Sequence, residues 1–202
     1  MTAEVITYMA ADQNRERRMQ FALVAQCAPF LKGLRAASIL SIEEKSVPDL
    51  CRILEATDIS CRVLPAEKGR CLVLFYRKGR ISMLLSQEAV RRFLEDYGYE
   101  DGDTEPERAV TRLCRRMEQY KEEIGTFPHE LGVFLGYPLE DVKAFIRNGG
   151  RGSLLAGYWK VYHNPERARL TFLAYDKARD SAVNEFLSGK NIREIAAAEN
   201  EL

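Results

Sequence analysis

Glycine and proline divide residues 127–163 into short pieces, and this spacing limits what the stretch can form. It reads FPHELGVFLGYPLEDVKAFIRNGGRGSLLAGYWKVYH and holds both histidines and the only tryptophan of the chain. Pro128 is tolerated at the first position of a helix. Gly136 followed by Pro138 ends that helix, because proline cannot continue it. Asn148 and the two glycines after it end a second helix. The stretch therefore predicts two short helices followed by an extended segment.

Apolar spacing supports both helices, which together span residues 128–148 and resemble a helix-turn-helix unit. The second helix would turn five residues outward: Glu140, Asp141, Lys143, Ala144 and Arg147. Carboxylates near the start of a recognition helix would repel phosphates. We therefore expect a packing hairpin, and keep a protein- or nucleic-acid-interaction module as the alternative.

The extended segment that follows alternates aromatic and other side chains. Tyr158, Lys160 and Tyr162 would share one face, and Trp159 and Val161 the other. Aromatic walls with one cation are typical of a small-molecule pocket, whereas large aromatic residues also serve as plain core. Asn164 is placed to cap the next helix, with Pro165 at its first position.

Several of these blocks are similar to a known family. FPHELGVFLGYPLEDVKAFI and GYWKVYHNPERA resemble the signature of the bacterial domain of unknown function 3793 (DUF3793) family, as do CAPFLKGLRAASIL (residues 27–40) and FLSGKNIREI (residues 186–195). The resemblance covers about residues 15–195. No activity comes with the family, so the resemblance implies kinship but no reaction.

Three positions depart from the family pattern. Gln26 stands where the first motif usually has histidine, and Ala156 and Ala178 stand where members often have cysteine. If those side chains form a metal or redox site in relatives, this chain has lost much of it, and a degenerate paralogue with a scaffold role becomes a further alternative.

Charge and composition narrow the function classes. Thirty basic and thirty acidic residues give no net charge, which argues against a dedicated nucleic-acid binder. The N-terminus has no apolar signal core and no run is long enough to span a membrane, so we expect a cytoplasmic protein. Its five cysteines, Cys27, Cys51, Cys61, Cys71 and Cys114, form no CxxC pair, which excludes a zinc or disulfide pattern by spacing.

The remaining pattern predicts an α+β fold. A small, three-stranded, mainly antiparallel sheet packed by helices precedes a helix-rich C-terminal half that contains the helix-turn-helix-like hairpin. The predicted strands are 37–42, 59–64 and 71–76, and the helices outside the central stretch are 14–34 (kinked or divided at Pro29), 46–56, 87–97, 106–123 and 165–187. Residues 192–200 are expected to form a short last helix or a fraying tail. The basic residues at 77–80 are expected in a solvated turn. We expect a single domain, 1–202, with a subdivision near 99–106 into an α/β part (14–98) and a mainly helical part (106–200).

The sequence assigns no reaction, because it has no P-loop, dinucleotide fingerprint, HExxH or GxSxG motif. The favoured hypothesis is a small-molecule- or cofactor-binding protein, with no metal ligands assigned and the cofactor and oligomeric state open. Its candidate ligand-binding residues are Cys27, His129, Tyr137, Trp159, Lys160 and Tyr162. A dyad of Cys27 with His129 would require the two side chains to meet, which spacing cannot decide.

Overall fold

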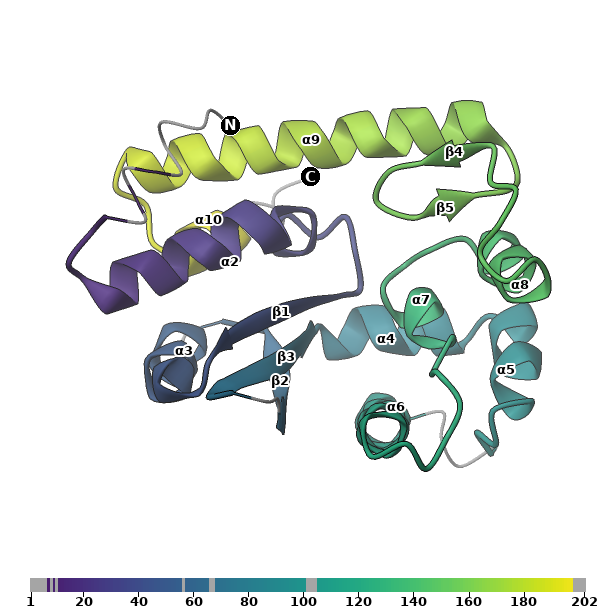
Figure 1. Cartoon of the computed structure of the whole chain (residues 1–202). Helices are drawn as coiled ribbons and strands as arrows, with labels where there is room; N and C mark the ends of the chain where they lie inside the picture. The colour runs from purple at the N-terminus through teal and green to yellow at the C-terminus, as the bar shows by residue number, and fades with distance from the viewer. Residues whose placement is uncertain are drawn as a thin grey trace. The chain divides into compact units, whose positions relative to one another are not determined.

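A computed structural model describes residues 7, 9, 11–55, 57–65, 68–100 and 105–197 of the chain (Figure 1). The protein is α+β, as predicted. Its contacts divide it into two compact units: unit 1 is Met1–Phe75 with Leu173–Leu202, and unit 2 is Tyr76–Phe172. The segment expected to subdivide the chain, 99–106, falls within unit 2, and residues 101–104 lie outside the described part.

The three predicted strands form one antiparallel sheet in the order β1-β3-β2. They are β1 (Ala37–Glu43), β2 (Ser60–Pro65) and β3 (Arg70–Tyr76). β3 is central, and its continuous run of apolar residues is far more buried than β2, which lies at an edge and buries only Leu64. β3 is therefore the most buried strand of the sheet, and it pairs with β2, the strand before it in the chain.

Helices cover this sheet in unit 1. They are α2 (Arg15–Leu31), the 3₁₀ turn η1 (Glu44–Ser46), α3 (Val47–Leu54), the second part of α9 (Pro165–Leu187) and α10 (Ile192–Ala197). The Asn14 side chain caps α2 by accepting from the Arg17 amide at 3.1 Å. Pro29 was expected to kink or divide α2, but the helix continues through it and ends two residues later.

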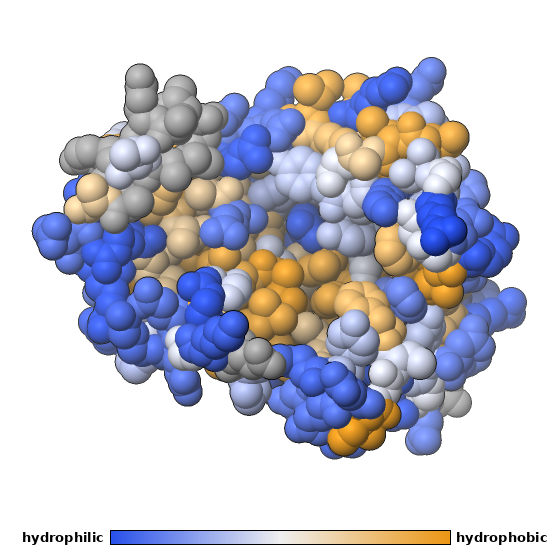
Figure 2. All heavy atoms as spheres, in the orientation of Figure 1, coloured by the Kyte–Doolittle hydropathy of each residue, from blue (hydrophilic) through white to orange (hydrophobic). Residues whose placement is uncertain are grey.

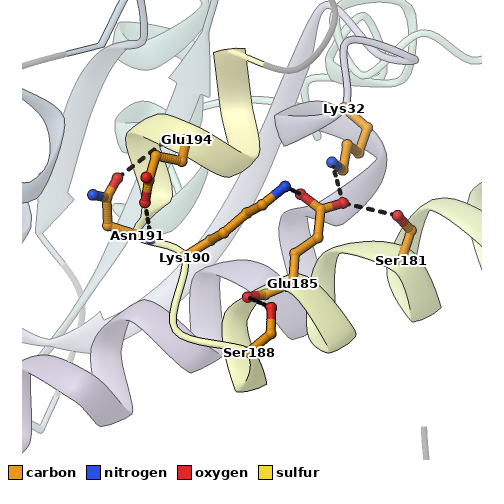
Figure 3. A network of polar contacts seen from close by, with 7 residues as sticks. All are labelled: Lys32, Ser181, Glu185, Ser188, Lys190, Asn191 and Glu194. Carbon is orange, nitrogen blue, oxygen red and sulfur yellow. Dashed lines mark hydrogen bonds and ion pairs between the residues drawn. The ribbon is translucent and has the colours of Figure 1, made fainter.

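A polar network joins the ends of two helices of unit 1 beside its apolar core (Figure 3). Glu185, in the last turn of α9, accepts from Lys32 at 2.7 Å, Ser181 at 2.9 Å and Lys190 at 3.2 Å. Burial raises the pKa of Glu185, but these hydrogen bonds outweigh it, so the net pKa lies below its usual value. The bonds also offset the unfavourable position of a carboxylate at a helix C-terminus.

The short helix α10 begins with a reciprocal cap. The Asn191 amide donates to the Glu194 side chain at 2.8 Å, and the Glu194 amide donates to the Asn191 side chain at 3.0 Å (Figure 3). Each side chain thus satisfies a backbone donor that a helix start would leave open. Ile192 and Ile195 follow on the face buried in the core.

Unit 2 is mainly helical. Its helices are α4 (Lys78–Leu85), α5 (Glu88–Glu95), α6 (Pro106–Lys121), α7 (Leu131–Phe134), α8 (Leu139–Arg147) and the start of α9. A two-stranded antiparallel hairpin, β4 (Leu155–Ala156) with β5 (Lys160–Val161), completes it. β5 lies against α8. No helix in the described part of the chain is long and apolar enough to cross a membrane.

One helix of unit 2 was missed by the sequence analysis. The basic residues expected in a turn begin α4 instead. Arg77 is buried just before it, and Lys78 forms an ion pair with Glu107 of α6 at 2.9 Å. Glu107 also accepts from the Tyr76 hydroxyl at 2.9 Å. The turn prediction was wrong because Ile81 and Leu85 are buried on one face of this segment, which packs against α6, a partner that local composition cannot show.

The helix-turn-helix interpretation is not confirmed. α7 is a single turn that begins at Leu131 rather than Pro128. Asp141 and Ala144, expected to face outward from α8, are each 2% exposed. Gly132 does lie at a close approach of α7 and α8, because a Cβ there would be 3.1 Å from Val142.

The segment after the hairpin has the structure that its sequence predicts. The Asn164 side chain accepts from the Arg167 amide at 3.1 Å and so caps α9, which spans the predicted residues Pro165–Leu187. Asn164 has a φ of 45°, a left-handed conformation that asparagine tolerates better than most residues. The first turns of α9 thereby start directly from the hairpin that carries Trp159 and Lys160.

Candidate functional site

A cavity of about 310 Å³ lies within unit 2. It is bounded by the segment before α7, by α7 and α8, and by the β4–β5 hairpin. Aromatic and aliphatic side chains make up most of its wall, with two charged groups. The lining residues are Phe127, His129, Leu131, Gly132, Leu135, Tyr137, Asp141, Val142, Phe145, Tyr158, Trp159 and Lys160.

Three aromatic rings in contact with one another support one wall of the cavity. The Trp159 indole stacks on Tyr137, with centroids 5.6 Å apart, and meets the edge of Phe172 at 4.6 Å. Phe172 can approach because residue 157 is glycine: a Cβ there would be 2.3 Å from the Phe172 ring. Offset and edge contacts of this kind are favourable ring geometries, so they help to hold the Trp159 indole in its orientation.

A buried carboxylate holds this wall to α8. Asp141 accepts from the Trp159 indole Nε1 at 2.8 Å, from the Tyr162 amide at 2.8 Å and from the His163 amide at 2.9 Å. The His163 Nδ1 lies 3.3 Å from the same carboxylate. Asp141 is in the first turn of α8, where the helix dipole also stabilises a negative charge. It therefore fixes the position of the hairpin and orients Trp159.

Asp141 was missed as a site residue. Its position beside the polar residues of α8 in the sequence predicted an outward side chain. Its partners lie about twenty residues further on, on a hairpin that spacing alone cannot bring to α8. The available signal was the single tryptophan, since a buried indole N–H requires an acceptor.

Lys160 is the cation of the cavity wall. Its ammonium donates to the Gly150 carbonyl at 2.7 Å and lies 5.8 Å from the centre of the Phe145 ring. Among the residues that the structure describes, no carboxylate lies within ion-pair distance of it. Because an ammonium has three N–H donors, Lys160 keeps donors for a ligand after bonding Gly150.

His129 is the second titratable group with a candidate role. Its ring packs between Phe127, with centroids 5.0 Å apart, and Phe145, at 5.8 Å. Burial lowers the pKa of the imidazole, so His129 is uncharged at neutral pH. Its ring nitrogens have no hydrogen-bond partner in the described part of the chain, and both remain open to a ligand.

The structure brings four of the six sequence-predicted site residues to one cavity: His129, Tyr137, Trp159 and Lys160. Tyr162 does not line it. Its amide donates to Asp141, and its hydroxyl is buried without a hydrogen-bond partner among the described residues.

Cys27 belongs to unit 1, where it is part of the apolar core. Burial raises the pKa of its thiol to about 11, against the smaller opposing effects of a hydrogen bond with Ser38 and the charge of Arg35. A thiol in that state is protonated at neutral pH and is a poor nucleophile. This disfavours the Cys27–His129 dyad as catalytic machinery.

The positions that depart from the family pattern are spread over both units. Gln26 is exposed on α2 and Ala178 is buried in α9, both in unit 1, whereas Ala156 is exposed on β4 in unit 2. Within the described ranges, no three His, Cys, Asp or Glu side chains gather in a way that would hold a metal ion.

A family model described as "Protein of unknown function (DUF3793)" matches residues 23–196. The chain belongs to the DUF3793 family. The match takes in every residue of the cavity and confirms the resemblance seen in the sequence. No curated protein and no solved structure matched this DUF3793 chain.

Proposed function

We propose that unit 2 binds a small organic anion with an apolar body, held in the cavity beside Trp159 and Lys160. The observation that carries the proposal is the Lys160 ammonium, which lies over an aromatic ring at the wall of an apolar cavity with a backbone carbonyl as its protein acceptor. A carboxylate of a ligand would supply the missing counter-charge through a charge-assisted hydrogen bond.

The size and lining of the cavity support a ligand site. A volume of about 310 Å³ falls at the lower end of the range typical of small-molecule pockets. The oxygens of Asp141, the other charged lining group, already accept from the indole and two backbone amides. A ligand therefore meets Lys160 as the available charged partner, and aromatic rings elsewhere.

Three probes of nearly equal size test the charge of the ligand: phenylacetate, phenylacetamide and benzyltrimethylammonium. Trp159 is the only tryptophan, so its fluorescence reports on this cavity alone. Phenylacetate should bind most tightly. Lys160→Met should weaken phenylacetate binding roughly 10- to 100-fold, as expected for loss of a hydrogen bond to a charged group, and leave phenylacetamide unchanged.

Lys143→Met is the matched control. Lys143 is an exposed lysine on α8 that lies over Phe93, away from the cavity lining. That variant should bind all three probes as the wild type does. Preference for benzyltrimethylammonium would instead identify a cation cage of aromatic rings and Asp141. Failure of all three probes to alter Trp159 fluorescence would remove the proposed function.

A further inference from the structure

Three large apolar side chains are exposed where α6 ends and the next segment begins. Tyr120, Ile124 and Phe127 are 45%, 72% and 43% exposed, respectively. We call them the α6-end patch. Figure 2 shows apolar areas among charged residues on the face that it draws.

The α6-end patch is continuous with the cavity. Phe127 lines the cavity and also meets Tyr120 edge-on, with centroids 5.2 Å apart. On its other side Phe127 contacts His129, and His129 contacts Phe145, the ring under the Lys160 ammonium. An unbroken row of rings thus runs from the cation at one end to exposed apolar surface at the other.

We infer that the cavity and the α6-end patch together hold one elongated amphiphile, a single-chain alkyl carboxylate. Its carboxylate meets Lys160 and its chain leaves the cavity over Phe127 to cover Tyr120 and Ile124. This inference rests on the proposed function and names the substrate class of the same site.

The row of rings from Tyr120 to Phe145 carries no charge, as contact with an alkyl chain requires. His129 is uncharged because burial lowers its pKa, so the chain meets apolar or neutral groups until it reaches Lys160. Covering three exposed apolar side chains is favourable in proportion to the area removed from water. Lys121, Glu122 and Glu123 are exposed beside the patch, and their net negative charge gives no attraction to an anionic membrane surface, which favours a single chain over a bilayer.

A series of alkyl carboxylates of increasing length tests whether the alkyl chain reaches the α6-end patch. Butanoate, octanoate and dodecanoate are titrated below their micellar concentrations against the wild-type protein, with Trp159 fluorescence and calorimetry as readouts. Affinity should rise about three- to fourfold for each methylene that leaves water, and the rise should continue from octanoate to dodecanoate because the longer chain reaches the patch.

The double variant Tyr120→Ser/Ile124→Ser isolates the patch, because neither residue lines the cavity. It should lose about tenfold or more in dodecanoate affinity and bind phenylacetate as the wild type does. Met83→Ser is the matched control, since Met83 is 64% exposed on α4 and lies outside the cavity lining. It should leave both affinities unchanged.

The outcomes separate this inference from the proposed function. Equal affinity for octanoate and dodecanoate, with phenylacetate still bound, would show that the alkyl chain does not reach the α6-end patch. It would overturn this inference but not the proposed small-anion site. Loss of phenylacetate binding as well would remove both. Co-sedimentation with neutral phosphatidylcholine vesicles that dodecanoate does not reverse would assign the patch to a membrane surface and overturn the inference.

Discussion

Burial decides what single residues of this protein can do. Asp141 and Cys27 are both almost fully buried, yet their surroundings differ in kind. The Asp141 carboxylate accepts hydrogen bonds from an indole N–H and two backbone amides, which stabilise its charge. Cys27 is surrounded mainly by apolar side chains, which disfavour its thiolate. The first therefore positions a wall of the cavity, and the second contributes packing.

Replacing Asp141 by asparagine should show how strongly it holds the hairpin. The amide nitrogen must face one of the donors, so a buried N–H is left unpaired. We expect a loss of about 1–3 kcal/mol in the free energy of unfolding, measured by urea denaturation, with Trp159 emission shifted to the red. Glu140→Gln, at the exposed neighbouring position, should change stability by less than about 0.5 kcal/mol. Equal stability of the two variants would contradict the role given to Asp141.

The cysteines should differ in reactivity by the same logic. In the native protein Cys27 should resist iodoacetamide at neutral pH, because burial keeps its thiol protonated and out of reach. Cys51 is exposed on α3 and should be alkylated. Peptide mass spectrometry of the labelled protein distinguishes the two sites. Rapid labelling of Cys27 without unfolding would show that the core opens there.

At the scale of elements, secondary structure that depends on residues close in the sequence could be predicted. The apolar run Cys71–Tyr76 became the central strand, and Asn164 before Pro165 marked the start of α9. What failed depended on distant partners. Lys78 starts a helix beside Glu107, and Asp141 turns inward toward Trp159. In the candidate site, residue types predicted four residues that line the cavity. Local spacing could not show that they share one cavity, nor that Asp141 accepts from the indole and so fixes the wall.

The junction of α2 with the end of α9 should depend on pH through Glu185. Its pKa is lower in the folded protein because Lys32, Ser181 and Lys190 bond the carboxylate. The stabilisation is therefore fully present above about pH 4.3, the usual glutamate pKa, and is lost as the pH falls through the lower folded value.

Glu185→Gln tests this junction. It should cost about 1–2 kcal/mol at pH 7 and progressively less in acid, as followed by urea unfolding across a pH series. In a double-mutant cycle with Lys32→Met the two losses should not add, because both remove the same bond. A difference between wild type and Glu185→Gln that stays constant into acid would contradict the assignment.

For the whole molecule, charge balance is the property that bears on partners. With thirty basic and thirty acidic residues, the chain has no excess of cations to replace the counterions of DNA. Fluorescence anisotropy with a labelled duplex at near-physiological salt should show a dissociation constant weaker than about 10⁻⁴ M, the weak limit of ordinary non-specific binding. Tighter binding that falls steeply with added salt would reveal a local basic surface and favour the interaction-module alternative.

The contact between Gly157 and Phe172 has a consequence for how this protein can vary. A methyl group at position 157 would lie 2.3 Å from the Phe172 ring, which in turn meets the edge of Trp159. Position 157 therefore cannot gain a side chain while the Phe172 ring stays in place: a relative with alanine at 157 needs a displaced ring or a smaller side chain at 172, and the edge contact with the indole changes. Among homologues the two positions should covary, and departures from the Gly–Phe pair should mark branches in which the cavity wall, and with it ligand preference, has changed.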